Sequence, residues 1–251
     1  MRDWVFRELK EVRRARYLIV GVPDAGLVGL IAATHLIRQV DTELVAYVDS
    51  SYLPPVIMYH EGRPYPVMRV HYHSDGGAGY LVLVSEVAMS ASGIHSFAQR
   101  LVEWGQAKGV ERIIMLGGVP SPQRINLEKP GVYAAGVTQA DAEFLERAGI
   151  SIFKEGFVSG PYAAILKECF ARSMGGVALL AESFLNYPDP GAAAAVLTAL
   201  SQVTGLKVDV KPLMEQEEEI RARLRETMRR TMEAMREAGK AYEYAVPAMY
   251  V

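Results

Sequence analysis

A group of polar side chains follows a buried strand predicted over residues 80–84. The group consists of Ser85, Glu86, Ser90, Ser92 and His95. Hydroxyl, carboxylate and imidazole groups can serve as nucleophile and general base, and α/β proteins often hold ligands at the carboxyl ends of their strands. Neither a nucleophile elbow nor a clear carboxylate pair accompanies the group. The competing interpretation is a polar loop in which Ser90 or Ser92 caps the next helix.

Two glycine-containing turns after other predicted strands complete this candidate pocket. Asp24 lies in the first turn, and Gly117 and Gly118 lie in the second. Because the carboxyl ends of parallel strands meet at one edge of a sheet, the turns are expected near Ser85 and His95. One hypothesis is therefore an enzyme that processes nucleosides, nucleotides or sugar phosphates.

The turn over residues 21–29 superficially imitates a dinucleotide-binding fingerprint. It opens a helix after a strand, and Asp49 lies 20 residues beyond Gly29. However, Pro23 stands where a second glycine would let the backbone approach a pyrophosphate, and no Lys-Ser/Thr pair follows. The pattern favours a tight turn and close helix packing, without a cofactor.

Histidine and cysteine offer little further chemistry. His60, His71 and His73 lie on a predicted hairpin, where histidines two residues apart on a strand can bind metal. We instead expect half-exposed polar residues and no metal. Cys169 is the single cysteine, which excludes an internal disulfide. It lies in an apolar helical stripe, so it is predicted to be a core residue and not a nucleophile.

The composition argues against nucleic acids and membranes as partners. The 251 residues carry 27 basic and 29 acidic side chains, a net charge of -2, which gives no field to attract nucleic acid or an anionic membrane. No apolar run approaches the roughly 20 residues needed to span a bilayer. The protein is therefore expected in the cytoplasm.

Alternating buried strands and helices predict a three-layer α/β sandwich with a mostly parallel sheet. The strands are predicted over residues 17–22, 43–48, 80–84, 112–116, 131–137 and 176–182. A β-hairpin near residues 56–73, with its turn at Glu61 and Gly62, is predicted to project from this body. The body is assigned to residues 1–210.

The helices have recognisable faces and ends. The helix over residues 27–40 is apolar nearly all round, so it is expected to be buried. The helix after Pro161 carries an apolar stripe consisting of Tyr162, Ile165, Leu166, Cys169 and Phe170. Thr138 and Asp141 have capping-box spacing, and Asp189 before Pro190 is a predicted N-cap of a helix that ends at Gly205.

A long amphipathic helix is predicted over residues 211–239, followed by an extended tail over residues 240–251. Acidic residues crowd its first turns and arginines its last, which suits the helix dipole, and Glu217 is expected to pair with Arg221. Pro247 disfavours a final helical turn. The chain closes on Met249, Tyr250 and Val251, a compact ligand of the kind that partner pockets capture by its carboxylate.

The chain resembles the proteasome assembly chaperone family, and its archaeal members in particular. The likeness rests on the glycine turn from Gly21 to Gly29, the Leu53-Pro54-Pro55 break, the Gly117-Gly118-Val119-Pro120 turn and Tyr187-Pro188-Asp189-Pro190 with its following alanines. The likeness covers roughly residues 15–235 of the chain. The resemblance implies a fold similar to purine nucleoside phosphorylases, without catalysis.

The same resemblance implies a homo-oligomer whose tails, of hydrophobic-Tyr-any type, dock on the α-subunits of the proteasome core particle. Met249, Tyr250 and Val251 match that tail position by position. Some relatives are described as ATP-grasp ligases, but a phosphate loop with magnesium-binding carboxylates is not recognisable here. Subunit number, co-assembly with a related subunit, and the choice between chaperone, activator and inhibitor stay open.

Overall fold

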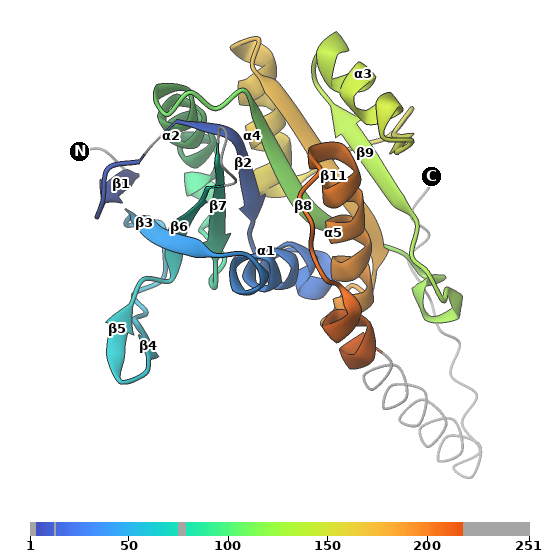
Figure 1. The fold of residues 1–251 in the computed structure, drawn as a ribbon, viewed down its shortest axis with the longest axis horizontal. Coiled ribbons are helices and arrows are strands. Elements are labelled where there is room, and N and C mark those ends of the chain that lie inside the picture. Colours follow the sequence, from blue (N-terminus) through green and yellow to red (C-terminus); the bar gives the residue numbers. More distant parts are fainter. Residues whose placement is uncertain (1–3, 13, 75–78, 218–251) are drawn as a thin grey trace.

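The computed structural model describes residues 4–12, 14–74 and 79–217, and within them the chain forms an α/β sandwich around a nine-stranded sheet (Figure 1). Four parallel strands form its centre. They are β7 (Gly79–Ser85), β2 (Ala15–Gly21), β8 (Arg112–Pro120) and β11 (Gly175–Ser183), in that spatial order. Their apolar runs are buried on both faces, as expected for strands covered by helices on each side.

The flanks make the sheet mixed, whereas the sequence favoured a mostly parallel one. Beyond β7 lie β6 (Met68–His73), β3 (Thr42–Asp49) and β1 (Val5–Glu8), all antiparallel to their neighbours. Beyond β11 lie β9 (Val132–Gly136), which is antiparallel to it, and β10 (Ser151–Ile152). Only five residues separate β6 from β7, too few for a parallel crossover.

The projecting hairpin is shorter than predicted. It consists of β4 (Met58–His60) and β5 (Arg63–Tyr65), which form a separate two-stranded sheet (Figure 1). Glu61 and Gly62 form its turn with φ values of 49° and 75°, as two-residue hairpin turns require. The prediction that this hairpin extends to His73 was wrong, because β6 lies inside the main sheet.

The buried polar residues of β6 explain that error. Arg69 pairs with Glu86 at 2.8 Å, and His71 lies between Thr42 and Tyr65. Burial, with the nearby charge of Arg69, lowers the pKa of His71 to about 4. His71 is therefore a neutral, buried residue with hydrogen-bond partners and not the half-exposed one expected. Among the described residues, no group of three or more His, Cys, Asp or Glu side chains could hold a metal.

The helices divide between the two faces of the sheet. Helices α2 (Ile94–Ala107) and α4 (Gly160–Ala171) pack on one face, and α1 (Val28–Gln39), α3 (Gln139–Arg147) and α5 (Pro190–Thr204) on the other. Helix α1 was expected to be buried all round, but Leu30, Ile31 and Ile37 are only half-buried. It covers the sheet with one face.

The predicted helix ends are confirmed for α3 and α5. Thr138 and Asp141 form the capping box, and the Asp189 side chain accepts a hydrogen bond from the Ala192 N–H. Gly205 ends α5 with a φ of 77°, in the left-handed region that glycine adopts without strain. Ser90 and Ser92 make no capping hydrogen bond, so that part of the prediction was wrong.

The apolar stripe of α4 is confirmed except at its edge. Cys169 is fully buried, and burial raises the pKa of its thiol to about 12, so it is a core residue. Phe170 was expected in the same face but is 70% exposed. At 100° per residue, Phe170 lies about 40° beyond Leu166, outside the arc that meets the sheet.

Two short strands were not predicted. β10 has only two residues and β1 has a half-polar sequence, so neither shows the alternation of apolar and polar residues by which a strand is predicted. β1 follows Trp4, which is fully buried, and the Trp4 indole donates a hydrogen bond to the Gly93 carbonyl at 3.0 Å. At the other end, residues 211–217 are helical, which agrees with the start of the long predicted helix.

Candidate functional site

Asp24 joins three segments at the carboxyl edge of the central strands. It follows β2, and its carboxylate accepts hydrogen bonds from the Gly29 N–H at 3.0 Å and the Gly118 N–H at 2.6 Å. Gly29 belongs to the first turn of α1, and Gly118 belongs to β8. The sequence therefore placed Asp24, Gly117 and Gly118 together correctly, and their contact is a junction between two strands and a helix.

The carboxylate of Asp24 has backbone donors but no cation among the partners that the structure gives it. Burial raises the pKa of Asp24 to about 7, although the N–H groups of Gly29 and Gly118 favour its ionised form. A carboxyl group that titrates near neutrality is suited to proton transfer. This is the strongest chemical feature of the candidate pocket.

The space around Asp24 is filled by Tyr162 of α4. Its hydroxyl donates a hydrogen bond to the Leu116 carbonyl at 2.5 Å and accepts one from the Val22 N–H at 3.2 Å. Burial, together with the charge of Asp24, raises the pKa of Tyr162 well above its usual value. The tyrosine is therefore a neutral core residue, and it packs against the junction from α4.

Close packing explains the glycines of this turn. A Cβ added at Gly29 would lie 2.3 Å from the Tyr162 hydroxyl, and one at Gly117 would lie 2.8 Å from the Asp24 carboxylate. A Cβ at Gly21 would meet the Gly29 carbonyl at 2.1 Å. These glycines allow a helix, a strand and a tyrosine to approach, as the sequence favoured over a phosphate-binding role.

The remaining residues of the candidate pocket make local contacts. Ser85 donates to the Val87 carbonyl at 2.7 Å, Glu86 pairs with Arg69, and the hydroxyls of Ser90 and Ser92 lie 2.9 Å apart. His95 is exposed on α2. The side-chain hydrogen bonds of Ser85, Glu86, Ser90 and Ser92 thus run within their own loop or to β6, whereas those of Asp24 run to α1 and β8.

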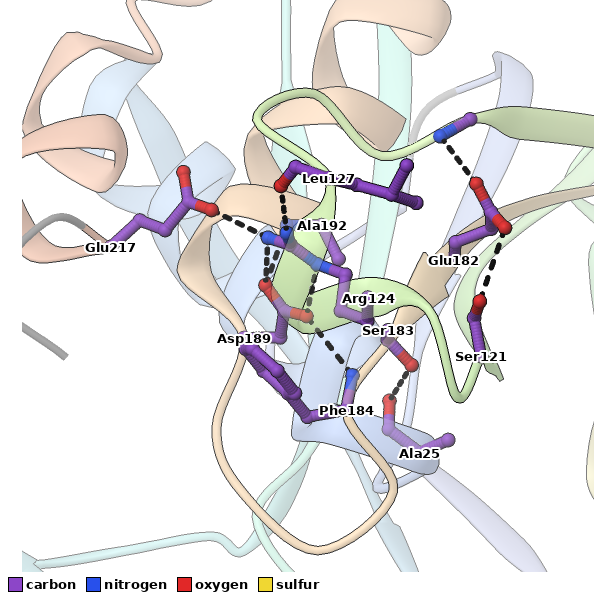
Figure 2. A network of polar contacts seen from close by, with 11 residues as sticks. Ala25, Ser121, Arg124, Leu127, Glu182, Ser183, Phe184, Asp189, Ala192 and Glu217 are labelled. Carbon is purple, nitrogen blue, oxygen red and sulfur yellow. Dashed lines mark hydrogen bonds and ion pairs between the residues drawn. The ribbon is translucent and has the colours of Figure 1, made fainter. Parts of the chain in front are cut away.

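A second polar cluster lies nearby, and the sequence did not reveal it. Arg124, in the short turn Arg124–Asn126 between β8 and β9, is fully buried (Figure 2). Its Nε and Nη2 donate to the two carboxylate oxygens of Asp189, both at 2.8 Å, and its Nη1 donates to the Leu127 carbonyl at 3.0 Å. This bidentate pair fixes the loop against the start of α5.

Glu217 completes the cluster from the beginning of the C-terminal helix. Its carboxylate accepts a hydrogen bond from Nη2 of Arg124 at 2.6 Å, and its side chain is about 5% exposed (Figure 2). It packs against Gly191, where an added Cβ would lie 2.3 Å from the Glu217 Cδ. Glu217 is therefore an anchor to the body, and its predicted partner Arg221 lies outside the described residues.

The buried cation and the two carboxylates of this cluster stabilise one another. Although burial opposes it, hydrogen bonds to Asp189 and Glu217 raise the pKa of Arg124. Asp189 also accepts hydrogen bonds from the N–H groups of Phe184 and Ala192, at 3.1 and 3.0 Å. The cluster thus joins the β8–β9 loop, the N-terminus of α5 and the start of the C-terminal helix.

The predicted binding residues Met249, Tyr250 and Val251 lie outside the described residues, as does the tail over 240–251. None of the helices formed by the described residues combines the length and apolar character that a membrane crossing requires.

Solved structures similar to this chain include archaeal proteins. PbaA of Pyrococcus furiosus, described as an archaeal homologue of proteasome-assembly chaperone, is 29% identical with a TM-score of 0.78, over 93% of this chain and 96% of that one. PbaB of the same organism, described as an archaeal proteasome activator, is 23% identical with a TM-score of 0.79, over 91% and 100%. The likeness to PbaB concerns the fold alone.

Sequence relatives agree with this likeness. An uncharacterized protein of Methanocaldococcus jannaschii is 26% identical over 225 residues, which is 90% of each chain. Residues 18–228 match the PAC2 family. That match covers the sheet apart from β1 and the first residues of β2, and it includes the Asp24 junction and the Arg124 cluster, so this chain belongs to the PAC2 family.

Proposed function

We propose that this protein is a cytoplasmic, non-catalytic partner of the proteasome, acting as an assembly chaperone or an activator that needs no ATP. The observation that carries the proposal is the likeness to PbaA over 93% of the chain at 29% identity, together with the PAC2 family match. The filled junction around Asp24 also supports a binding role over a catalytic one.

The binding element in this proposal is the C-terminal tail. Met249, Tyr250 and Val251 form a hydrophobic-Tyr-any sequence that ends in a carboxylate. The carboxylate would pair with a lysine between neighbouring α-subunits of the proteasome ring, and Tyr250 would pack against the wall of that pocket. The domain organisation, with a body over 1–210, a helix over 211–239 and a tail over 240–251, belongs to the same proposal.

The Arg124 cluster gives the tail a defined origin. Glu217 is held by Arg124 and packs against Gly191, and 34 residues follow it in the sequence. Every copy therefore presents its tail from the same point of the body.

Several copies are needed because one tail is a weak ligand. A tripeptide supplies about 4 to 5 kcal/mol, a Kd of about 1 mM. Linked tails raise the overall affinity by about 100-fold or more when they bind together. The proposal therefore includes a homo-oligomer, whose subunits the apolar face of the helix over 211–239 is suited to join.

Tail variants test the proposal directly. Deleting residues 249–251, or the substitution Tyr250→Ala, should abolish co-sedimentation with proteasome core particles and leave the mass of the oligomer in solution unchanged. Tyr187→Ala is the matched control, since Tyr187 is 55% exposed on the body, and it should bind as the unaltered protein does. Undiminished binding by the deletion variant would exclude the tail as the docking element.

The alternative function is an enzyme that processes nucleosides or nucleotides, or a ligase of the ATP-grasp type. The observation in its favour is the Asp24 carboxyl group, with a pKa of about 7 at the carboxyl edge of the sheet. The expected similarity of the fold to purine nucleoside phosphorylases belongs to the non-catalytic proposal above and does not imply this activity. Thermal shifts with nucleosides, nucleotides and phosphate test it, because a bound ligand stabilises the folded state. The absence of stabilisation by any of them would count against it.

A further inference from the structure

An apolar groove runs beside the anchored start of the C-terminal helix. It has a volume of about 340 Å³, and its floor is one face of α5 that includes Ala194, Ala195 and Thr198. Val132 of β9 forms one wall, and Met214 forms another. A groove of this size holds a few side chains and not a folded element. Its occupant is therefore a short apolar segment.

One of the residues that line this groove is positively charged. Lys129 is the only charged side chain among the described residues that line it, and Lys129 is exposed. A hydrophobic cleft with a single ammonium group favours a ligand that is apolar and carries one negative charge. A peptide ending in a free carboxylate has that chemistry.

The chain itself supplies such a peptide. We propose that residues 248–251 of the same chain dock in this groove, with the carboxylate of Val251 beside Lys129. The segment reads Ala248, Met249, Tyr250 and Val251, so its carboxylate is its only charge. The tail would thus have two binding places, one on its own body and one on a partner.

The length of chain after Glu217 permits this return. Glu217 packs against Gly191, which itself lines the groove, so the helix starts beside it. Residues 218–239, if helical as their sequence predicts, extend about 33 Å. Residues 240–251 span at most about 40 Å when extended. The tail is therefore just long enough to come back to the origin of its own helix.

Docking on the body would regulate the proposed function, on which this consequence rests. A tail that must extend almost fully to reach its own groove meets it at an effective concentration below millimolar order, whereas a short peptide binds with a Kd of about 1 mM. A minority of the tails would then be docked at equilibrium. Release of the tails would strengthen binding to a multivalent partner, because each docked tail is withheld from it.

Zero-length carbodiimide cross-linking of the full-length protein tests this contact without any proteasome. The reagent couples a carboxylate to an amine with loss of water, so a docked tail yields an amide between Val251 and the Lys129 Nζ, read by mass spectrometry. Lys129 should dominate over Lys207 and Lys211 as the partner of the terminal carboxylate. Equal coupling to these lysines would overturn the proposal.

A groove-filling variant sharpens the test. Ala195→Gln fills the groove at a half-buried position, and if it weakens docking tenfold the cross-linked fraction should fall by close to tenfold. Ser201→Gln is the matched control, because Ser201 lies near the C-terminal end of α5 and is not among the residues that line the groove. An unchanged yield in Ala195→Gln would also overturn the proposal.

Mixing of isotopes identifies the donor of the tail. An oligomer assembled from ¹⁵N-labelled and unlabelled chains should give cross-linked peptides that are wholly labelled or wholly unlabelled. Mixed pairs would show a second copy as the occupant and would overturn docking within one chain. A positive cross-link with no proteasome binding would contradict the proposed function and leave this contact standing.

Discussion

The carboxyl edge of the sheet buries two carboxylates in different ways. Asp24 is held by the N–H groups of Gly29 and Gly118, whereas Asp189 is held by the guanidinium of Arg124 as well as by N–H groups. Backbone donors alone leave the pKa of Asp24 at about 7. The first site is therefore a packing junction whose carboxyl group is sensitive to pH, whereas the second is an anchor built on a buried arginine.

The largest expected effect comes from removing the cation of the anchor. Arg124→Met leaves Asp189 and Glu217 buried without their counter-charge, which should lower the free energy of unfolding by about 3 to 5 kcal/mol. Urea denaturation followed by circular dichroism measures it.

Arg172→Met is the matched control for that variant. Arg172 pairs with Glu103 and Glu168 at the surface, so its loss should cost at most about 1 kcal/mol. If the two substitutions lowered the free energy of unfolding equally, the Arg124 cluster would be no more stabilising than an ordinary surface ion pair.

An intermediate effect is expected from crowding the Asp24 junction. Gly29→Ala would place a Cβ 2.3 Å from the Tyr162 hydroxyl and 2.4 Å from the Leu116 carbonyl. Such overpacking should lower the free energy of unfolding by about 1 to 3 kcal/mol. Gly105→Ala is the control, because its Cβ would meet its nearest neighbour, Leu18, at 3.6 Å. That variant should be as stable as the unaltered protein, or more so, and a destabilised Gly105→Ala would show that the packing argument does not separate the two positions.

A pH dependence of the free energy of unfolding is expected at Asp24. Its pKa is about 7 in the folded protein and 3.8 in its ordinary state, so the folded protein binds more protons between these values. The free energy of unfolding should therefore fall as pH rises from about 4 to about 7, and then level off. The ¹³C shift of the carboxyl group should have its midpoint near pH 7.

Asp24→Asn supplies the control for this titration. The substitution should flatten that part of the stability profile, whatever its effect on stability at a single pH. A carboxyl midpoint near pH 4 would make Asp24 resemble an ordinary exposed carboxylate and would remove the pH sensitivity assigned to its junction.

Local signals explain most of what the sequence revealed. The apolar runs of β2, β7, β8 and β11 and the caps at Thr138 and Asp189 depend on neighbours within a few residues, and each was predicted. The junction of Asp24 with Gly118 followed from the parallel order of the strands.

Long-range partners explain what was missed. Arg124 contacts residues 65 and 93 positions away, and in sequence it resembles any loop arginine. Glu217 carried a local signal that pointed to Arg221, whereas its described partner is Arg124. The buried polar residues of β6 were misjudged for the same reason. Arg69 pairs with Glu86 in the loop after β7, and His71 contacts Thr42 and Tyr65 on two other strands.

Trp4 affects the edge of the sheet that β1 forms. Trp4 precedes β1, which pairs with β3 and takes its place at the edge of the sheet. The edge strand is therefore four residues long instead of eight, and a short edge strand is a poor template for a strand of another molecule. The indole donates a hydrogen bond to Gly93, stacks with Tyr52 and contacts the tilted ring of Phe97, so one side chain fixes β1 in place. Protection of this sheet edge from unwanted association thus depends on a residue at the very beginning of the described chain.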